Sequence, residues 1–436
     1  MSALSNSIRR LPQHTINRIA AGEVIERPAS VIKELVENAL DAGATQIDIH
    51  FEAGGRRVLS VTDDGSGMNR DELVLAVERH ATSKLKPAKD GHWDLLNIAT
   101  MGFRGEALPS IGAIARLSIT TQILDAGEAW EIKIEGGDLS GPKPAPRFGL
   151  SGTRVSVKDL FYATPARLKF LKTERSEAMA ISDVVKRLAM ARADVGFRLQ
   201  NEARKVLNLP REFDNSEGRL KRLADILGHD FKDNALLIDA DREGVKLSGF
   251  AGLPTYSRGS STHQYLFIND RPVRDKLLYG AVRGAYQDFL SRGRHPVVAL
   301  YIDIDPTHVD VNVHPAKSEV RFREPALVRG LIVGALRHAL AGAGHRAATT
   351  TSSFALGKAQ AGGGFTAKSR YGQYTPPPRP EFTDQPLIDG LSARVEEPLS
   401  PFETQATDTQ APDQGEYPLG LARAQLHETY IITQTR

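Results

Sequence analysis

A helix with one polar side is the feature that most limits what this chain can fold into. Residues Pro28–Ala42 carry proline in the first turn and Gly43 just beyond the end, as helices commonly do. Apolar side chains follow one stripe, while Glu34, Asn38 and Asp41 share the opposite side. Because residues four apart lie one above the other, the carboxylate of Glu34 and the amide of Asn38 are predicted to face one ligand. The alternative is a solvated polar face on an amphipathic helix.

A carboxylate at the end of a strand pattern adds a second candidate contact. Residues Arg57–Asp63 alternate like a strand, and Asp63 leads into a turn that contains Gly65 and Gly67. A carboxylate there can accept a hydrogen bond from the exocyclic amine of adenine, and the glycines let the backbone approach a base closely. An ordinary Asp-Gly hairpin turn is the alternative interpretation.

A glycine loop before a helical pattern is the third candidate. Free backbone N–H groups at such a position attract phosphate, although an ordinary turn before a helix is the alternative. The loop residues are Gly102, Phe103, Arg104 and Gly105. A predicted lid upstream offers hydroxyl groups and a cation. Its residues are Thr82, Ser83 and Lys84.

Together the three segments predict a site that binds and hydrolyses ATP. Glu34 is placed to accept a proton from an attacking water, and the side-chain oxygen of Asn38 is a hard ligand that suits Mg²⁺ beside phosphates. The motif Gly-x-x-x-x-Gly-Lys-Ser/Thr does not occur in the sequence. The pocket therefore belongs to a design without a P-loop, with ATP and Mg²⁺ as its cofactors.

Hydrophobic patterning divides the chain into two folded parts and a tail. Short strands and helices run through residues 1–215, and their hairpin-like spacing favours an α/β (α+β) fold with a mixed, mostly antiparallel sheet. Residues 216–344 predict a smaller α+β domain. Residues 345–415 are rich in Ala, Thr, Gly and Pro and are predicted to be a flexible, disordered linker. In residues 416–436, the strand pattern Tyr430–Thr435 has nothing after it to pair with, which favours the start of a further domain.

Composition sets the outer limits of these predictions. A chain of 436 residues suggests two or three domains. The 56 basic residues exceed the 53 acidic ones by three, so a basic surface, if present, has to be local. The absence of cysteine excludes disulfides and thiol nucleophiles and fits a reducing compartment. No apolar run approaches the ~18 residues of a membrane span, and the first residues lack a signal-peptide pattern. We expect a cytoplasmic protein without a membrane partner.

A local basic cluster is the candidate contact for DNA. It consists of Arg271, Arg274 and Lys276. Contacts with DNA phosphates need only such cations and carry little sequence preference, although a solvated helix start is the alternative. Alternating histidines and oxygen ligands farther along form a competing candidate for a metal site, with solvated histidines as the alternative. They are His308, Asp310, Asn312 and His314.

Several longer runs resemble a known family, the MutL mismatch-repair proteins. The family carries the GHKL ATPase module that type II topoisomerases, ninety-kilodalton heat-shock chaperones and histidine kinases share. The similar runs include Leu-Phe-Tyr-Ala-Thr-Pro-Ala-Arg at 160–167 and Val-Asn-Val-His-Pro-Ala-Lys at 311–317, besides residues 19–28, 41–45, 79–84 and 102–108. The resemblance covers about residues 11–323 and implies a GHKL ATPase α/β sandwich followed by a transducer-like second domain.

The resemblance implies a role for each candidate residue. It implies Glu34 as the general base, Asn38 as the Mg²⁺ ligand and Asp63 as the adenine contact. Gly65 and Gly67 match the turn beneath the base, residues 82–84 the lid, and residues 102–105 the phosphate loop. Lys317 matches a lysine that the second domain extends to the γ-phosphate.

The resemblance also implies a function. We expect a DNA mismatch repair mediator that binds ATP, hydrolyses it slowly and closes as a homodimer on DNA. It would couple mismatch recognition by MutS to a downstream nuclease and helicase. Another ATP-driven clamp of the GHKL type, chaperone-like or topoisomerase-like, is the alternative. The endonuclease motif of the family's C-terminal dimerisation domain, Asp-Gln-His-Ala-x-x-Glu, does not occur in this sequence. Residues 416–436 resemble the segment that opens that domain.

Overall fold

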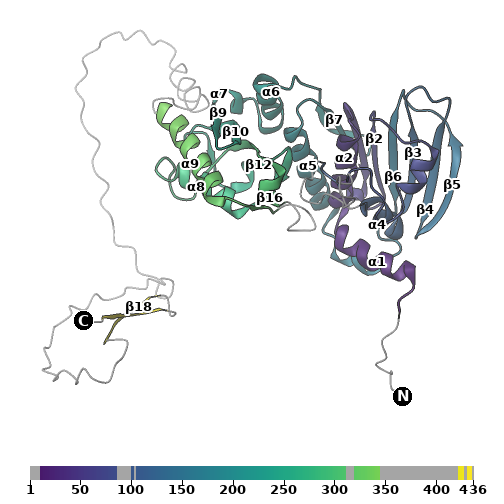
Figure 1. The fold of residues 1–436 in the computed structure, drawn as a ribbon, viewed down its shortest axis with the longest axis horizontal. Coiled ribbons are helices and arrows are strands. Elements are labelled where there is room, and N and C mark those ends of the chain that lie inside the picture. The colour runs from purple at the N-terminus through teal and green to yellow at the C-terminus, as the bar shows by residue number, and fades with distance from the viewer. Residues whose placement is uncertain are drawn as a thin grey trace, which may run out of the picture. The chain divides into compact units, whose positions relative to one another are not determined.

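The computed structural model describes residues 10–85, 100–102, 105–310, 319–343, 421–426 and 430–434. The chain divides into a first unit, Met1–Gly364, and a second unit, Phe365–Arg436. Two large sheets lie in the first unit, each with helices packed on it (Figure 1). We propose a domain boundary between Asn215 and Ser216, where the chain passes from one sheet to the other.

The first sheet has eight strands and confirms the predicted mixed, mostly antiparallel arrangement. Only the pair β1–β7 is parallel among the seven neighbouring pairs. The order across the sheet is β5 (Asp138–Ala145), β4 (Ala129–Glu135), β3 (Arg116–Gln122), β6 (Gly152–Lys158), β2 (Val58–Asp63), β1 (Gln46–Glu52), β7 (Gly196–Asn201) and β8 (Arg204–Leu209). The associated helices are α1 (Gln13–Val24), α2 (Pro28–Asp41), α3 (Arg70–Leu75), α4 (Ala107–Ile114), α5 (Glu174–Ala191), η1 (Ala53–Gly55) and η2 (Pro165–Phe170).

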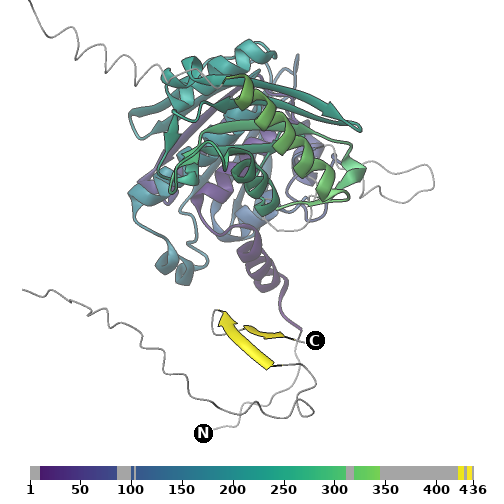
Figure 2. The same ribbon diagram turned by 90° about the vertical axis from the view of Figure 1, so that its left-hand side faces the viewer.

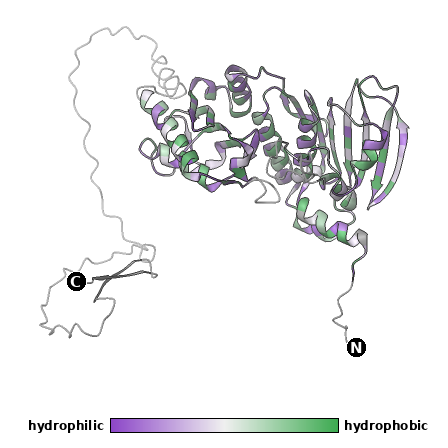
Figure 3. Ribbon diagram, viewed as in Figure 1, coloured by the Kyte–Doolittle hydropathy of each residue, from purple (hydrophilic) through white to green (hydrophobic). Residues whose placement is uncertain are grey.

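One face of the first sheet is covered by helices, which makes a two-layer sandwich. Burial alternates along β1 and β2, as a strand with one covered face requires. Figure 3 shows apolar and polar residues following one another along these strands. Helix α2 packs against both β2 and α5. The alternation that buries Leu59 and Val61 also places Asp63 on the helix-covered face, so a carboxylate lies in phase with the core.

The second sheet is covered on both faces. Its central strands are continuously apolar and buried, as expected when neither face meets water. The order is β13 (Arg271–Val273), β12 (Gln264–Ile268), β15 (Val298–Asp303), β10 (Val245–Gly252) and β9 (Ala235–Arg242), with only β12–β15 parallel. One core contains α8 (Lys276–Tyr286) and α9 (Pro325–Gly342), and α9 crosses the front of the view in Figure 2. The other core contains α6 (Ser216–Leu227), α7 (Asp230–Asp233) and the end of α5. Short elements complete this part: β11 (Ser257–Arg258), η3 (Ser261–His263), β14 (His295–Pro296), η4 (Pro306–His308), β16 (Val309–Asp310) and β17 (Arg321–Phe322).

Two buried side chains tie the second sheet and α6 to the end of α5. The hydroxyl of Tyr301 donates to the carbonyl of Met190 at 2.9 Å. Arg222 of α6 is fully buried, and its guanidinium donates to five backbone carbonyls. These carbonyls belong to Ala189, Arg192, Ala193, Val195 and Pro210.

In the second unit the structure describes an antiparallel pair of strands. Strand β19 (Tyr430–Gln434) pairs with β18 (Leu421–Leu426). The expectation that the terminal strand has no partner in this chain was therefore wrong, since its partner precedes it in the sequence. The predicted linker, residues 345–415, lies outside the described residues.

Candidate active site

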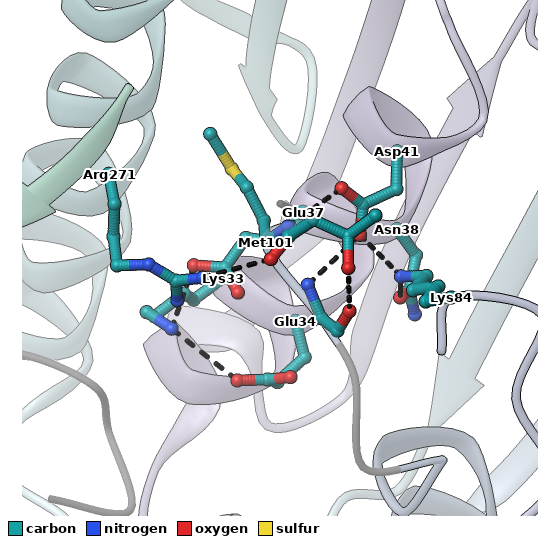
Figure 4. A network of polar contacts seen from close by, with 10 residues as sticks. Lys33, Glu34, Glu37, Asn38, Asp41, Lys84, Met101 and Arg271 are labelled. Atoms are coloured by element: carbon teal, nitrogen blue, oxygen red, sulfur yellow. Dashed lines mark hydrogen bonds and ion pairs between the residues drawn. The ribbon is translucent and has the colours of Figure 1, made fainter. Parts of the chain in front are cut away.

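The polar side of α2 carries a buried cluster of opposite charges. The ammonium of Lys33 lies 2.8 Å from Glu37 Oε1 and 3.4 Å from Glu34 Oε1 (Figure 4). Burial lowers the pKa of Lys33, but the carboxylates of Glu37 and Glu34 outweigh burial, so that this pKa stands above its ordinary value. Glu34 therefore lies beside a permanent cation. Sequence reasoning missed Lys33 and Glu37, although both lie within one helical turn of Glu34.

The other end of this polar side brings together an amide, a carboxylate and a lysine. Lys84 Nζ donates to Asn38 Oδ1 at 2.7 Å and to Asp41 Oδ2 at 2.5 Å. The same carboxylate accepts hydrogen bonds from the backbone N–H groups of Met101 and Gly102, both at 2.9 Å. Asp41 thus fixes the start of the glycine loop against α2 (Figure 4). It was placed on the polar side from the sequence but was not assigned to the site.

Close approach of the backbone requires glycine at position 105 of the loop. A Cβ at Gly105 would lie 2.3 Å from the carbonyl oxygen of Ala81, whereas a Cβ at Gly102 would meet only the mobile end of the Lys84 side chain, at 2.8 Å. Gly105 also has a φ of +61°, which favours glycine. Thr82 Oγ1 accepts from the N–H of Lys84 at 3.2 Å, and Ser83 lies between these two residues. The remaining predicted loop residues, Phe103 and Arg104, lie outside the described residues.

Asp63 is a buried carboxylate held by backbone donors. Its side chain accepts from the N–H of Gly65 at 3.0 Å and from that of Thr153 at 3.3 Å, and the residue is 8% exposed. Burial raises the pKa of Asp63 to about 6, against the opposing effect of these hydrogen bonds. A Cβ at Gly65 would lie 2.9 Å from the carbonyl oxygen of Ala42, and one at Gly67 would lie 1.9 Å from that of Gln122. The turn after Asp63 thus fits between α2 and β3 only with glycine at both positions.

The pKa of the neighbouring carboxylate, Asp64, is shifted in the opposite direction. It accepts from the N–H groups of Thr45 and Gln46 and from the hydroxyl of Thr45, at distances of 2.6 to 2.8 Å. Burial would raise the pKa of Asp64, but these hydrogen bonds outweigh burial and lower it. Asp64 therefore anchors the turn as an anion, while the more deeply buried Asp63 is the carboxylate poised near neutrality.

The predicted basic cluster does not form one exposed surface. Arg271 is 5% exposed, and its Nη2 donates to the carbonyl of Thr100 at 3.1 Å. Arg274 is exposed and forms an ion pair with Asp183 of α5 at 2.8 Å, and Lys276 is exposed at the start of α8. The assignment of Arg271 to a DNA surface is corrected here, because a buried guanidinium cannot reach a phosphate of a duplex in this conformation.

Two other predictions fall partly outside the described residues. Lys317, Asn312 and His314 are not among them. Asp310 ends strand β16, but His308 ends the 3-10 helix η4. His308 and Asp310 therefore do not alternate along one strand as expected. In the part of the chain that the structure describes, no group of three or more His, Cys, Asp or Glu side chains could hold a metal ion. None of the described helices is long and apolar enough to cross a membrane.

Comparisons with known proteins agree with this fold. Residues 25–135 match the family described as "Histidine kinase-, DNA gyrase B-, and HSP90-like ATPase", and residues 223–341 match "DNA mismatch repair protein, C-terminal domain". The DNA mismatch repair protein MutL of Caulobacter vibrioides is 56% identical over 98% of this chain and 73% of its own length. The MutL protein of Phenylobacterium zucineum is 57% identical over 98% of this chain and 72% of its own length. The solved ATPase domain of Aquifex aeolicus MutL, complexed with ADP, has a TM-score of 0.50 at 26% identity, and the match covers 71% of this chain and 98% of that one.

The fold, the site and the two family matches define an ATPase of the GHKL type joined to a DNA mismatch repair domain. Identity above half across almost the whole chain narrows this class to a single family. The chain belongs to the MutL family of DNA mismatch repair proteins.

Proposed function

We propose that this chain binds ATP with Mg²⁺ at the polar side of α2, hydrolyses it, and uses the cycle as a switch in mismatch repair. The observation that carries the proposal is the meeting of three separate segments at one helix. Asp41 fixes the glycine loop, Lys84 joins the same carboxylate, and Asp63 lies on the face of the sheet that α2 covers. A GHKL ATPase fold and a relative solved with ADP support it.

In this proposal the adenine end of the nucleotide lies at Asp63. Its carboxylate accepts a hydrogen bond from the exocyclic amine of adenine, while Gly65 and Gly67 let the backbone lie close to the base. The phosphates lie at the loop from Gly102 to Gly105, with Thr82, Ser83 and Lys84 beside them. Lys317 contacts the terminal phosphate.

The donor set at Asn38 fits a hard cation. Its side-chain oxygen already accepts from an ammonium group, and oxygen donors are the ligands that Mg²⁺ prefers. Mg²⁺ bound there would neutralise phosphate charge. Glu34 takes the proton from the attacking water, and the ammonium of Lys33 lies 3.4 Å from its carboxylate.

Replacing Glu34 by alanine tests the hydrolytic role. We expect Glu34→Ala to lower the turnover of ATP at least about a hundredfold, because it removes the base, and to change the affinity for ATP less than about threefold. Phosphate release and the fluorescence polarisation of a labelled ATP analogue measure the two quantities. The matched control is Glu174→Ala, which removes an exposed carboxylate that pairs with Arg56. Wild-type turnover in Glu34→Ala would refute the assignment.

We further propose that the exposed cations at the start of α8 contact DNA phosphates. Replacing Arg274 and Lys276 by glutamate should weaken binding to all sequences alike and flatten its dependence on salt, since fewer counterions are released. Filter binding over a salt series measures both effects. The double replacement of the exposed Arg204 and Lys205 by glutamate makes the same change of charge on β8 and is the control. If the salt dependence of DNA binding is unchanged when Arg274 and Lys276 are replaced, these residues do not contact DNA.

As a partner of DNA, the chain is proposed to close as a homodimer in response to ATP. In mismatch repair it would couple the recognition of a mismatch by MutS to a downstream nuclease and helicase. The cytoplasm is the proposed location.

A further inference from the structure

Arg271 stands at a fixed point on the edge of the second sheet. It begins β13, directly after a two-residue turn in which Asn269 and Asp270 have φ angles of 47° and 62°. Positive φ at both residues is the geometry of a tight hairpin turn whose twist suits the flanking strands. The side chain of Asn269 braces the turn by bonding both the N–H and the carbonyl of Ile304. The backbone that carries Arg271 is therefore rigidly set by the second sheet.

The side chain of Arg271 leaves its own sheet and ends beside the glycine loop. Its Nη2 donates to the carbonyl of Thr100, which lies 171 residues away in the sequence. Its Nη1 is buried without a hydrogen-bond partner among the described residues, so this one contact fixes a largely desolvated cation. Leaving a charged donor unsatisfied costs free energy, so the burial of Arg271 does not by itself stabilise the protein.

Thr100 connects this contact to the active site in a few bonds. Its hydroxyl donates to the carbonyl of Gly102 at 2.7 Å, while the N–H groups of Met101 and Gly102 are bonded to Asp41. The first residues of the loop are thus held from two sides, by α2 and by the second sheet (Figure 4). The charge of Arg271 also acts on Lys33, which in turn lies 3.4 Å from Glu34.

We propose that Arg271 is a positioning residue for ATP turnover, which holds the start of the glycine loop in place from the second sheet. The inference rests on the proposed function. It differs from the contact assigned to Lys317, because Arg271 acts on the loop and needs no nucleotide to do so. Through Arg271, the second sheet is then connected to the proposed phosphate end of the site without a bound nucleotide.

The test separates positioning from binding. We expect Arg271→Gln to lower kcat about tenfold, because misplacement of a reacting group is costly, while the affinity for ADP changes less than about threefold. Arg271→Lys keeps the positive charge and can still donate a hydrogen bond, so its kcat should lie between those of Arg271→Gln and the wild type. The control is Arg337→Gln on α9, which also removes a bond from a guanidinium to a backbone carbonyl in the same half of the molecule and should leave kcat unchanged.

A double-mutant cycle with Asp41→Asn supplies a second measurement. Because both side chains hold the same loop residues, the combined variant should turn over ATP about as slowly as the slower single variant, rather than at the product of the two losses. Multiplicative losses, an unchanged kcat in Arg271→Gln, or equal losses of ADP affinity and kcat would overturn the inference. If Arg271→Gln does not fold, Arg271→Lys carries the same cycle. A wild-type chain without ATP turnover would instead overturn the proposed function.

Discussion

If Asp63 contacts the adenine as proposed, that contact is gained at the expense of stability. Its pKa in the folded protein is about 6, against an ordinary value of 3.8, because burial disfavours the charged form. Folding therefore favours protonation of Asp63, and this favourable contribution is present below pH 4 and lost as the pH rises through about 6. At neutral pH the free protein holds an ionised carboxylate that its surroundings oppose, at a cost of roughly 3 kcal/mol.

Replacing Asp63 by asparagine should separate the two effects. Asparagine Oδ1 can still accept from Gly65 and Thr153, so we expect Asp63→Asn to raise the unfolding temperature of the free protein at pH 8. The gain should disappear near pH 4, where Asp63 itself is protonated. Affinity for ATP should fall at least about tenfold, because an amide donor would face the adenine amine. Thermal unfolding across pH and polarisation of a labelled ATP analogue check the prediction. A destabilised variant at pH 8 would contradict the argument from burial.

Residue positions could be predicted where they depend on local spacing and not where they depend on distant contacts. The four-residue spacing of Glu34 and Asn38 needs only helical geometry, and the structure places both on one side of α2. Asp41 shares that side, but its bonds to Met101 and Gly102 cross 60 residues of sequence. Arg271 was assigned to a DNA surface because it belongs to a local basic cluster in the sequence, whereas the tertiary fold buries it.

At the scale of elements, alternation in the sequence predicts part of the first sheet. Strands β1, β2, β3, β4 and β6 follow such alternation, whereas β5 is exposed along most of its length and shows none. The terminal hairpin was missed because β18 (Leu421–Leu426) mixes small, charged and apolar residues without a clear alternation. Pairing with β19 depends on the partner strand, which local propensity does not contain.

The buried guanidinium of Arg222 connects α6 to the elements around it. Five carbonyls at the end of α5 and the ends of neighbouring strands depend on one guanidinium. We expect Arg222→Lys to lower the free energy of unfolding by at least about 3 kcal/mol, because a lysine ammonium has three donors and cannot serve all five acceptors. Urea unfolding measures the loss. Lys221→Met on the same helix removes an exposed ion pair with Glu212 and should change stability by less than about 1 kcal/mol. Equal effects of the two variants would contradict the prediction.

At the scale of the whole molecule, α4 links the glycine loop to helix α1. Helix α1 packs on α4, and α4 begins directly after Gly105 and Glu106. Leu11, Ile16 and Ile19 expose apolar side chains there, with exposed fractions of 48%, 38% and 55%. We propose that a nucleotide bound at the loop acts through α4 on this apolar surface and favours its contact with a second copy of this chain.

This arrangement predicts a nucleotide-dependent dimer. We expect a non-hydrolysable ATP analogue with Mg²⁺ to convert the 436-residue chain from monomer to dimer, and ADP to leave it monomeric. Sedimentation velocity with each nucleotide measures the change. Asp63→Asn, with its nucleotide contact removed, should stay monomeric under the same conditions. A stable dimer without nucleotide, or a monomer at saturating analogue, would contradict the proposed switch.

The bond between Lys84 and Asn38 makes metal binding an exchange of ions. The amide oxygen proposed to hold Mg²⁺ already accepts from an ammonium group that also neutralises Asp41. A divalent ion on the same oxygen would lie within a few ångströms of that ammonium, and like charges so close repel strongly. Entry of the metal therefore requires departure of the lysine, and the arriving phosphates provide an anion for the lysine to meet. The affinity measured for Mg²⁺ would then be the difference between two cations competing for one oxygen atom.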